Sequence, residues 1–243
     1  MTQRQFVPLL IAGWLTLPIP ARAQAEAQSD SGWKPQIIVY FVGAGMSGET
    51  AIRGVSRDID AGFGDIVENL EFGFMGAFRI QKRAWSVGTD INYIGLGTSG
   101  AAGQIEVDSD QWMVELNGGY MIRPFFTVIA GARYNSLSTR LFFPQSGNEL
   151  KGSQDWIDPL IGGRLDLRLG KEWMAHVRGD IGGFGVGSDF AWQLVPGVEW
   201  MPSDRLSALA GYRILSMDYE NKDDGFKYDV TVSGPALGLL CHF

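Results

Sequence analysis

Hydrophobic and polar residues alternate along most of the chain after residue 70. In residues 71–80, for example, phenylalanine, glycine and isoleucine occupy the even positions, whereas Glu71 and Arg79 lie at odd positions. Successive side chains of a β-strand point to opposite faces, so this period of two predicts strands with one apolar and one polar face. Similar segments recur between turn-forming residues, and they predict an all-β, antiparallel, up-and-down protein of about ten strands, with eight or twelve as alternatives. The expected strands cover approximately residues 35–46, 71–80, 85–93, 111–120, 126–135, 158–169, 173–181, 189–200, 206–214 and 226–243.

Alternation alone is compatible with a soluble β-sandwich, whose charged face is exposed, and with a membrane barrel, whose apolar face meets lipid. Aromatic residues favour the barrel, because many lie on apolar faces near strand ends, as in the girdles at membrane interfaces. A sheet in lipid must also close on itself to satisfy its backbone groups. We therefore predict a transmembrane β-barrel and keep an exported soluble sandwich or lipocalin-like binder as an alternative. The expected interface aromatics are Trp85, Tyr93, Trp112, Tyr120, Tyr134, Trp173, Trp200 and Tyr212.

Connections between the expected strands alternate in length. Residues 81–84 and 170–172 form short turns, whereas residues 47–70 and 95–110 form long loops. Outer-membrane barrels combine short periplasmic turns with long extracellular loops, so we expect an even number of strands and periplasmic termini. Within the first long loop, residues 63–70 are expected to form a short helix or to widen the second strand.

The last expected strand contains a change of parity. Phe226 and Tyr228 place apolar side chains at even positions, whereas Leu237 and Phe243 place them at odd positions. A β-bulge at residues 234–235 would reconcile the two halves, because a bulge tolerates the missing N–H of a proline. The sequence therefore predicts a bulge there.

The C-terminal residues Leu237, Leu239, Cys241 and Phe243 form an apolar series that resembles the last strand of bacterial outer-membrane β-barrels. In that class a terminal aromatic residue is part of the signal read by the barrel-assembly machinery, and the resemblance implies this role for Phe243. Residues 33–243 as a whole resemble small Gram-negative outer-membrane barrels, which include opacity-type adhesins, the transmembrane domain of OmpA-like proteins and small-molecule channels. The resemblance implies location in the outer membrane, in contact with lipid and lipopolysaccharide, and indicates no oligomeric state.

The N-terminus has the features of a secretory signal peptide. Arg4 precedes an apolar stretch, and Ala21-Arg22-Ala23 fits an A-x-A cleavage site. We therefore expect three parts: a signal peptide at residues 1–23, a flexible periplasmic segment at residues 24–32 and the barrel at residues 33–243.

The charge of the mature chain limits its partners. Removal of Arg4 and Arg22 from the 20 basic residues leaves 18 basic against 27 acidic residues, a formal charge of −9. This balance argues against a nucleic-acid partner. The single cysteine, Cys241, cannot form an internal disulfide and is expected to face lipid.

Charged residues on the polar faces are expected to line the lumen. Acids and arginines occur there in near-equal numbers, which predicts ion pairs, because unpaired charges in a confined space are costly. Side chains largely fill a barrel of about ten strands, so we predict a plugged lumen. His176 lies in the densest part, which is either a structural ion-pair ladder or a site that responds to protons or a ligand. The expected lumen charge network comprises Glu71, Arg79, Asp90, Glu115, Arg133, Asp158, Arg164, Asp166, Arg168, His176, Arg178, Asp180, Glu199 and Arg213.

These features predict a non-enzymatic integral barrel that contributes to envelope structure or surface interaction. An outer-membrane enzyme is disfavoured, because the two histidines, His176 and His242, are both expected at the periplasmic end. We expect no catalytic residue, no cofactor and no metal site; the acidic residues 218–224 lack the spacing of an EF-hand loop. The alternative function is a narrow pore for a small solute, lined by Arg133, Arg164, Arg178 and Arg213.

Overall fold

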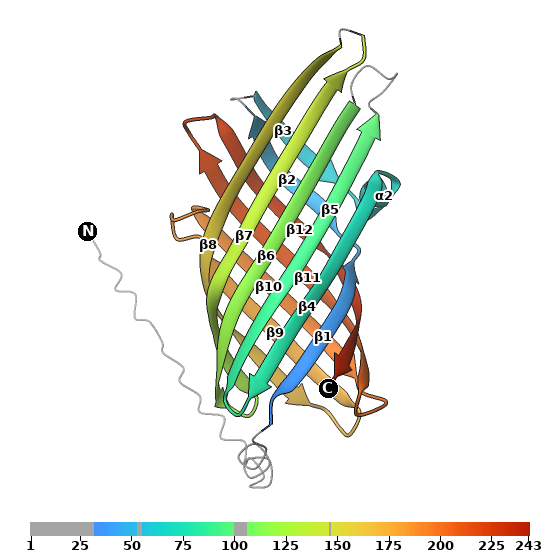
Figure 1. Ribbon diagram of the computed structural model, residues 1–243, viewed down its shortest axis with the longest axis vertical. Helices are drawn as coiled ribbons and strands as arrows, with labels where there is room; N and C mark the ends of the chain where they lie inside the picture. Colours follow the sequence, from blue (N-terminus) through green and yellow to red (C-terminus); the bar gives the residue numbers. More distant parts are fainter. Residues whose placement is uncertain (1–31, 53–54, 100–105, 146) are drawn as a thin grey trace, which may run out of the picture.

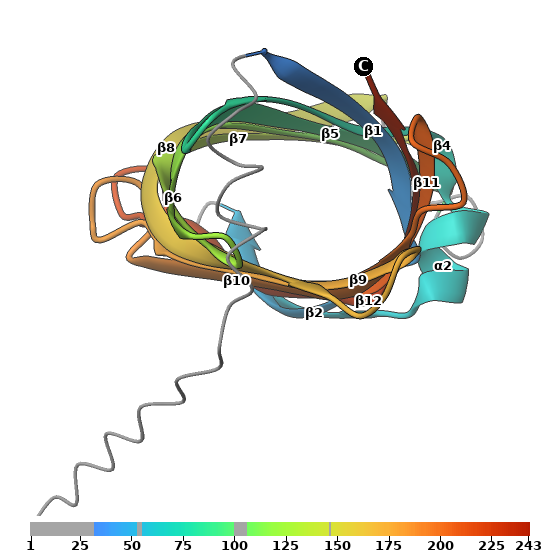
Figure 2. The same cartoon turned by 90° about the horizontal axis from the view of Figure 1, so that it is seen from below.

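The computed structural model describes residues 32–52, 55–99, 106–145 and 147–243. The expected signal peptide and nearly all of the expected segment 24–32 lie outside the described residues. Ten antiparallel strands form a closed barrel (Figures 1 and 2). They are β1 (Lys34–Val42), β4 (Leu70–Lys82), β5 (Trp85–Ser99), β6 (Glu106–Arg123), β7 (Phe126–Phe143), β8 (Asn148–Arg168), β9 (Trp173–Gly182), β10 (Phe190–Trp200), β11 (Leu206–Asn221) and β12 (Phe226–His242).

The pairing order closes the sheet. β1 pairs with β4, the strands from β4 to β12 pair in chain order, and β12 pairs with β1. This arrangement confirms the predicted up-and-down barrel of ten strands. Gln36 pairs with His242, so both ends of the barrel segment lie at one rim, together with the short turns. In outer-membrane barrels that rim is periplasmic.

The first expected strand is divided in two. β1 is followed by β2 (Gly45–Ile52), and both pair with β12 in one register, so they form one line interrupted at residues 43–44. β2 forms a hairpin with β3 (Val55–Ala61), and helix α2 (Phe63–Glu68) leads from this hairpin to β4. Part of the expected loop 47–70 is therefore sheet, and residues 63–68 form the short helix that was one of the two expectations there.

The helical content of the described residues is small. None of their helices is long and apolar enough to cross a membrane.

The predicted bulge in the last strand is wrong. β12 pairs with β11 in one unbroken register from Phe226, opposite Asn221, to Cys241, opposite Leu206. Phe226 and Tyr228 point into the barrel and are buried, whereas Leu237 points outward and is 65% exposed. The change of parity therefore reflects a change in where apolar side chains are needed along a regular strand.

The barrel has two zones, which differ in the side chains that point outward, as the two halves of β12 show. In the membrane zone, the outward side chains are apolar and exposed, as at Leu116, Ile161 and Leu239. Farther from the periplasmic rim the outward side chains are polar, as at Asp155 and Asp229. We call this part the outer extension: β2, β3 and the portions of β6, β7, β8, β11 and β12 that lie beyond Asp110, Ser136, Asp155, Ser216 and Ser233.

The base of the outer extension has an apolar interior. Buried hydrophobic side chains from several strands form one cluster at its base, and Trp156 stacks on Tyr219 with ring centroids 4.2 Å apart. The membrane zone differs, because its interior holds most of the buried charged side chains, beside apolar ones such as Ile129 and Leu240. The cluster comprises Met113, Trp156, Ala191, Leu215, Met217, Phe226, Tyr228 and Val230.

Exposed aromatic side chains lie at two heights on the membrane zone. Near the periplasmic rim, Trp85 contacts Tyr120 with ring centroids 4.7 Å apart, and Trp173 and Trp200 lie 6.3 Å apart. Near the outer boundary, Tyr93 contacts Trp112 at 4.6 Å. Eight residues of β5 separate Trp85 from Tyr93, about 26 Å along a strand. With a strand tilt of about 35–45°, this is about 20 Å along the barrel axis, close to the ~25 Å apolar band of outer-membrane barrels. Tyr134 and Tyr212 also face outward and are exposed.

Candidate functional site in the polar lumen

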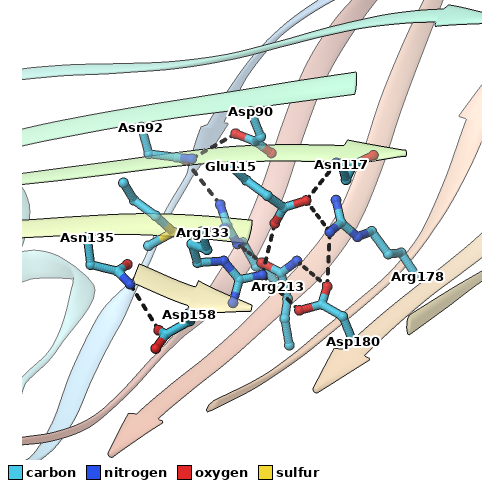
Figure 3. Close-up of polar contacts among 12 residues, drawn as sticks. Asp90, Asn92, Glu115, Asn117, Arg133, Asn135, Asp158, Arg178, Asp180 and Arg213 are labelled. Atoms are coloured by element: carbon cyan, nitrogen blue, oxygen red, sulfur yellow. Dashed lines mark hydrogen bonds and ion pairs between the residues drawn. The ribbon is translucent and has the colours of Figure 1, made fainter. Parts of the chain in front are cut away.

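Four charged side chains meet in the centre of the lumen (Figure 3). Glu115 on β6 and Arg133 on β7 are direct cross-strand partners, and Arg178 and Asp180 lie two residues apart on one face of β9. Arg133 donates to Glu115 at 2.9 Å and to Asp180 at 2.8 Å. Arg178 donates to the same two carboxylates, at 2.5 Å and 3.0 Å. We call Glu115, Arg133, Arg178 and Asp180 the central quartet.

The central quartet is deeply buried. The side chains of Arg133 and Asp180 are 1% and 0% exposed, and those of Glu115 and Arg178 are 4% and 18% exposed. Two acids and two arginines therefore neutralise one another in a confined volume. Removing one partner of such a buried pair leaves an uncompensated charge and typically costs about 3–5 kcal/mol.

A second polar network joins the quartet through Gln193 on β10, the cross-strand neighbour of Asp180 on β9. Gln193 donates to Asp180 at 3.1 Å and accepts from Arg213 at 2.9 Å. Arg213 also donates to Tyr40 at 3.2 Å and to Asn92 at 3.1 Å. These contacts run without interruption from β1 and β5, through β11 and β10, to the quartet on β6, β7 and β9.

Asp90 and Asn117 extend the two networks. Tyr40 donates to Asp90 at 2.6 Å, and Asn92 donates to the same carboxylate at 2.7 Å. Asn117 donates to Glu115 at 2.7 Å.

Asp158 anchors the connection between β9 and β10 against the wall. It accepts from the backbone N–H of Ser188 at 2.6 Å and from Asn135 at 3.0 Å. Gly187 packs so closely here that a Cβ atom would lie 2.4 Å from the carbonyl oxygen of Ile157. The glycine-rich segment 183–189 is thus held in place by a carboxylate outside the central quartet.

A cavity of about 240 Å³ lies on the periplasmic side of these networks, and we call it the vestibule. Arg164 donates to Asp166 in its wall at 2.8 Å, and Arg79 donates to Gln36 at 2.8 Å. His176 lies against Gly197, where a Cβ atom would fall 2.5 Å from its Nε2.

At the periplasmic rim, His242 links three strands. Gln36 contacts its Nδ1 at 3.1 Å, and Ser207 contacts its Nε2 at 3.1 Å. Glu199 Oε1 lies 3.4 Å from the same Nε2.

The structure distributes the expected lumen residues over several places. Asp90, Arg213 and the central quartet form one connected network, whereas Asp158 lies apart from it. The dense group expected around His176 is split, since Arg164 and Asp166 line the vestibule while Arg178 and Asp180 belong to the quartet.

Two expected members, Glu71 and Arg168, belong neither to the connected network nor to the vestibule wall, and they do not contact Asp158 among the described residues. Glu71 lies at a register shift between Leu70 and Phe72, and its carboxylate lies over Gly97, on the face that carries outward side chains. Arg168 is exposed near the periplasmic rim.

Uncharged residues carry much of the network, and sequence reasoning left them out of the site. Asn92, Asn117 and Gln193 are at inward positions of their strands, so the period of two could have found them. Tyr40 was obscured, because residues 36–42 are apolar on both faces.

A closed sheet with an apolar outward band, exposed aromatics at two heights and a polar lumen defines an integral outer-membrane β-barrel protein. Such a protein is located in the outer membrane of a Gram-negative bacterium, in an environment of lipid and lipopolysaccharide.

Comparisons with known proteins agree at the level of the fold. The structure is similar to the outer-membrane protease OmpT from Escherichia coli, with a TM-score of 0.53, 8% identity and coverage of 88% of this chain and 97% of that chain. It is also similar to Ail, the attachment invasion locus protein of Yersinia pestis (TM-score 0.44, 13% identity, 88% and 100% coverage), and to the translocator domain of the autotransporter NalP from Neisseria meningitidis (TM-score 0.46, 12% identity, 92% and 93% coverage). No family model and no curated protein matches the chain.

Proposed function

We propose that this protein is a plugged, non-conducting barrel that contributes to the structure of the envelope or to interactions at the cell surface. The observation that carries the proposal is that two closures lie in series along the lumen. The first is the polar network centred on Glu115, Arg133 and Asp180, and the second is the apolar cluster of the outer extension.

The polar closure resists opening because its charges satisfy one another. Its contacts of 2.5–3.2 Å connect side chains from seven strands, so a solute at this level must separate ion pairs. Charge-assisted contacts in a low-dielectric interior are strong, and each separated charge would have to be rehydrated.

The apolar closure excludes water by a different mechanism. Tyr228 and Met217 are 1% and 0% exposed, and Trp156 stacks on Tyr219 across the interior. Opening it would expose apolar surface to water, which costs a free energy of about 25 cal/mol per Å². A hydrated ion would therefore meet an obstacle that offers it no polar partner.

The histidine at the rim supports a non-enzymatic function. Gln36 Oε1 accepts from Arg79, so its NH₂ group faces His242 Nδ1. This orientation assigns the acceptor role to Nδ1 and the proton to Nε2, which then donates to Ser207. A histidine in this tautomer cannot accept the proton of the Ser207 hydroxyl, as nucleophilic catalysis would require.

The end of the chain supports recognition by the barrel-assembly machinery. Phe243 is 73% exposed, and its backbone N–H donates to the Pro35 carbonyl at 3.1 Å, across the seam between the first and last strands. We propose that this outward aromatic ring is the assembly signal.

Planar-bilayer recording tests the two closures. We expect no conductance from the wild type or from either double variant, Glu115→Ala/Arg133→Ala or Phe226→Ala/Tyr228→Ala. The first double variant removes opposite charges together. The combined quadruple variant is expected to conduct, because both closures are then weakened.

Heat-modifiability gels provide the control that each variant is a folded barrel. Steady unitary conductance of the wild type would contradict the proposal and favour the narrow pore, whose arginines would then line the constriction.

A further inference from the structure

The vestibule is an amphipathic cavity at the periplasmic end of the lumen. Its volume is about 240 Å³, and apolar side chains such as Ile38, Ile129 and Leu240 form part of its wall. Arg79 and Glu199 also line it. A cavity with mainly apolar walls and a few convergent polar groups is the usual form of a small-molecule site.

Most charges of the lumen have a partner of opposite sign. The central quartet is balanced within itself, and Arg164 pairs with Asp166 at 2.8 Å. Arg213 and Asp90 are linked through the side chains of Tyr40 and Asn92. In the vestibule this leaves one positive and one negative side chain, Arg79 and Glu199.

Arg79 retains an uncompensated positive charge. Its Nε donates to Gln36 Oε1 at 2.8 Å, and a terminal nitrogen donates to the same oxygen. Gln36 is neutral, and no carboxylate forms an ion pair with Arg79 among the described residues. A guanidinium has five N–H donors in a planar fork, so Arg79 has donors left for an anionic group.

Glu199 has a buried oxygen without a hydrogen bond. Its side chain is 5% exposed, and among the described residues no donor bonds to Oε1. His242 Nε2 lies 3.4 Å away, beyond hydrogen-bond distance of a typical donor, and it also contacts Ser207 at 3.1 Å. A buried carboxylate oxygen without a donor is costly, and the ammonium group of a ligand would remove that cost.

We propose that the vestibule binds a small zwitterion from the periplasm, with its anionic group on Arg79 and its ammonium group near Glu199. The side chains of Gln36 and His242 lie between these charges, in consecutive contacts of 2.8, 3.1 and 3.4 Å. This separation favours the terminal charges of a dipeptide over the closely spaced charges of a free amino acid. The apolar part of the wall accommodates short aliphatic side chains.

Calorimetric titration of the folded protein in detergent micelles with alanyl-alanine tests the proposal. We expect saturable binding by the wild type and at least a tenfold loss of affinity in Arg79→Gln and in Glu199→Gln, since each loses one charge-assisted contact. The amide of alanyl-alanine lacks the carboxylate and should bind weakly to the wild type. To Arg79→Gln, the amide and the dipeptide should bind with equal affinity. N-acetyl-alanyl-alanine lacks the ammonium group and should also bind weakly to the wild type. To Glu199→Gln, it and the dipeptide should bind with equal affinity.

Two controls keep the result specific. Arg168→Gln and Glu220→Gln change charges outside the vestibule and should bind like the wild type. Arg79→Lys and Glu199→Asp keep the charges and should retain part of the affinity if the glutamine variants fail to fold.

The proposal is overturned if the wild type does not bind alanyl-alanine. It is also overturned if both blocked analogues bind to the wild type as tightly as the dipeptide, or if the vestibule variants bind the dipeptide like the wild type. Because this experiment measures binding and the bilayer experiment measures conduction, the proposed function and the vestibule site can fail independently.

Discussion

The membrane zone and the outer extension are built from the same strands with opposite patterns. In the inner part of β12, Leu237 and Leu239 point outward and are 65% and 57% exposed. In the outer part of the same strand, Phe226, Tyr228 and Val230 point inward and are buried. The backbone register does not change between them.

This difference shows that the medium outside the barrel determines the pattern. Lipid requires an apolar outer face and permits a polar lumen, whereas water requires a polar outer face and favours an apolar core. The membrane zone is consequently held together inside by charge-assisted contacts, and the outer extension by hydrophobic packing.

The largest expected effect is in the membrane zone. Arg133→Met leaves Glu115 and Asp180 with Arg178 as their shared partner, and should lower the free energy of unfolding by about 3–5 kcal/mol. Urea titration of the protein in micelles measures this change. Arg140→Met is the matched control, because Arg140 is 52% exposed in the outer extension and should lose about 0–1 kcal/mol. Equal losses in both variants would contradict the account.

The next effect should be confined to the outer extension. Met217 is fully buried in its core, so Met217→Ala should cost about 2–5 kcal/mol. We expect hydrogen exchange to accelerate in the outer parts of β11 and β12 while the amides of the membrane zone keep their protection. Uniform acceleration over the whole barrel would show that the two zones unfold as one unit.

Outward charges should distinguish the zones directly. Leu239→Lys places a charge in the middle of the lipid-facing band and should cost about 2–4 kcal/mol in lipid bilayers. Thr231→Lys, eight residues away on the same face of β12, should cost no more than about 0.5 kcal/mol. Folding titrations into lipid vesicles compare the two, and similar costs would remove the distinction between the zones.

The smallest effect concerns acidic residues outside the membrane. Burial and the neighbouring carboxylates of Asp229 and Asp189 raise the pKa of Asp218 in the folded protein. A raised folded-state pKa means that Asp218 favours the folded state at low pH and loses that contribution as the pH rises through the folded-state pKa. Asp218→Asn should therefore stabilise the outer part of β11 at neutral pH, by less than about 1 kcal/mol. Hydrogen exchange at two pH values measures the change; a pH dependence identical in variant and wild type would contradict it.

Much of the barrel could be predicted from local pattern. The period of two is a property of each strand, so the strand number and the outward aromatics Trp85 and Trp112 follow from sequence alone. The outer extension could not be predicted in this way, because inward residues such as Phe226 were assigned by apolar character to the lipid face. The expected bulge at residues 234–235 followed from that assumption.

The sequence also could not predict which side chains contact one another in the lumen. Arg213 donates to Asn92, which lies 121 residues away in the chain, and Arg178 reaches Glu115 across 63 residues. Long arginine side chains can contact strands that are not their neighbours in the sheet, so cross-strand pairing does not determine their partners. The cross-strand pair Glu115 and Arg133 could be predicted, whereas the central quartet could not.

Nitroxide accessibility measures the inversion of polarity along β12 at single positions. In a Cys241→Ser background, single spin labels introduced by Asp229→Cys, Thr231→Cys, Leu237→Cys and Leu239→Cys can be compared in lipid bilayers. We expect labels at 237 and 239 to be accessible to oxygen in lipid and protected from a water-soluble nickel reagent, and labels at 229 and 231 to show the reverse. A lipid-type response at 229 and 231 would contradict the account.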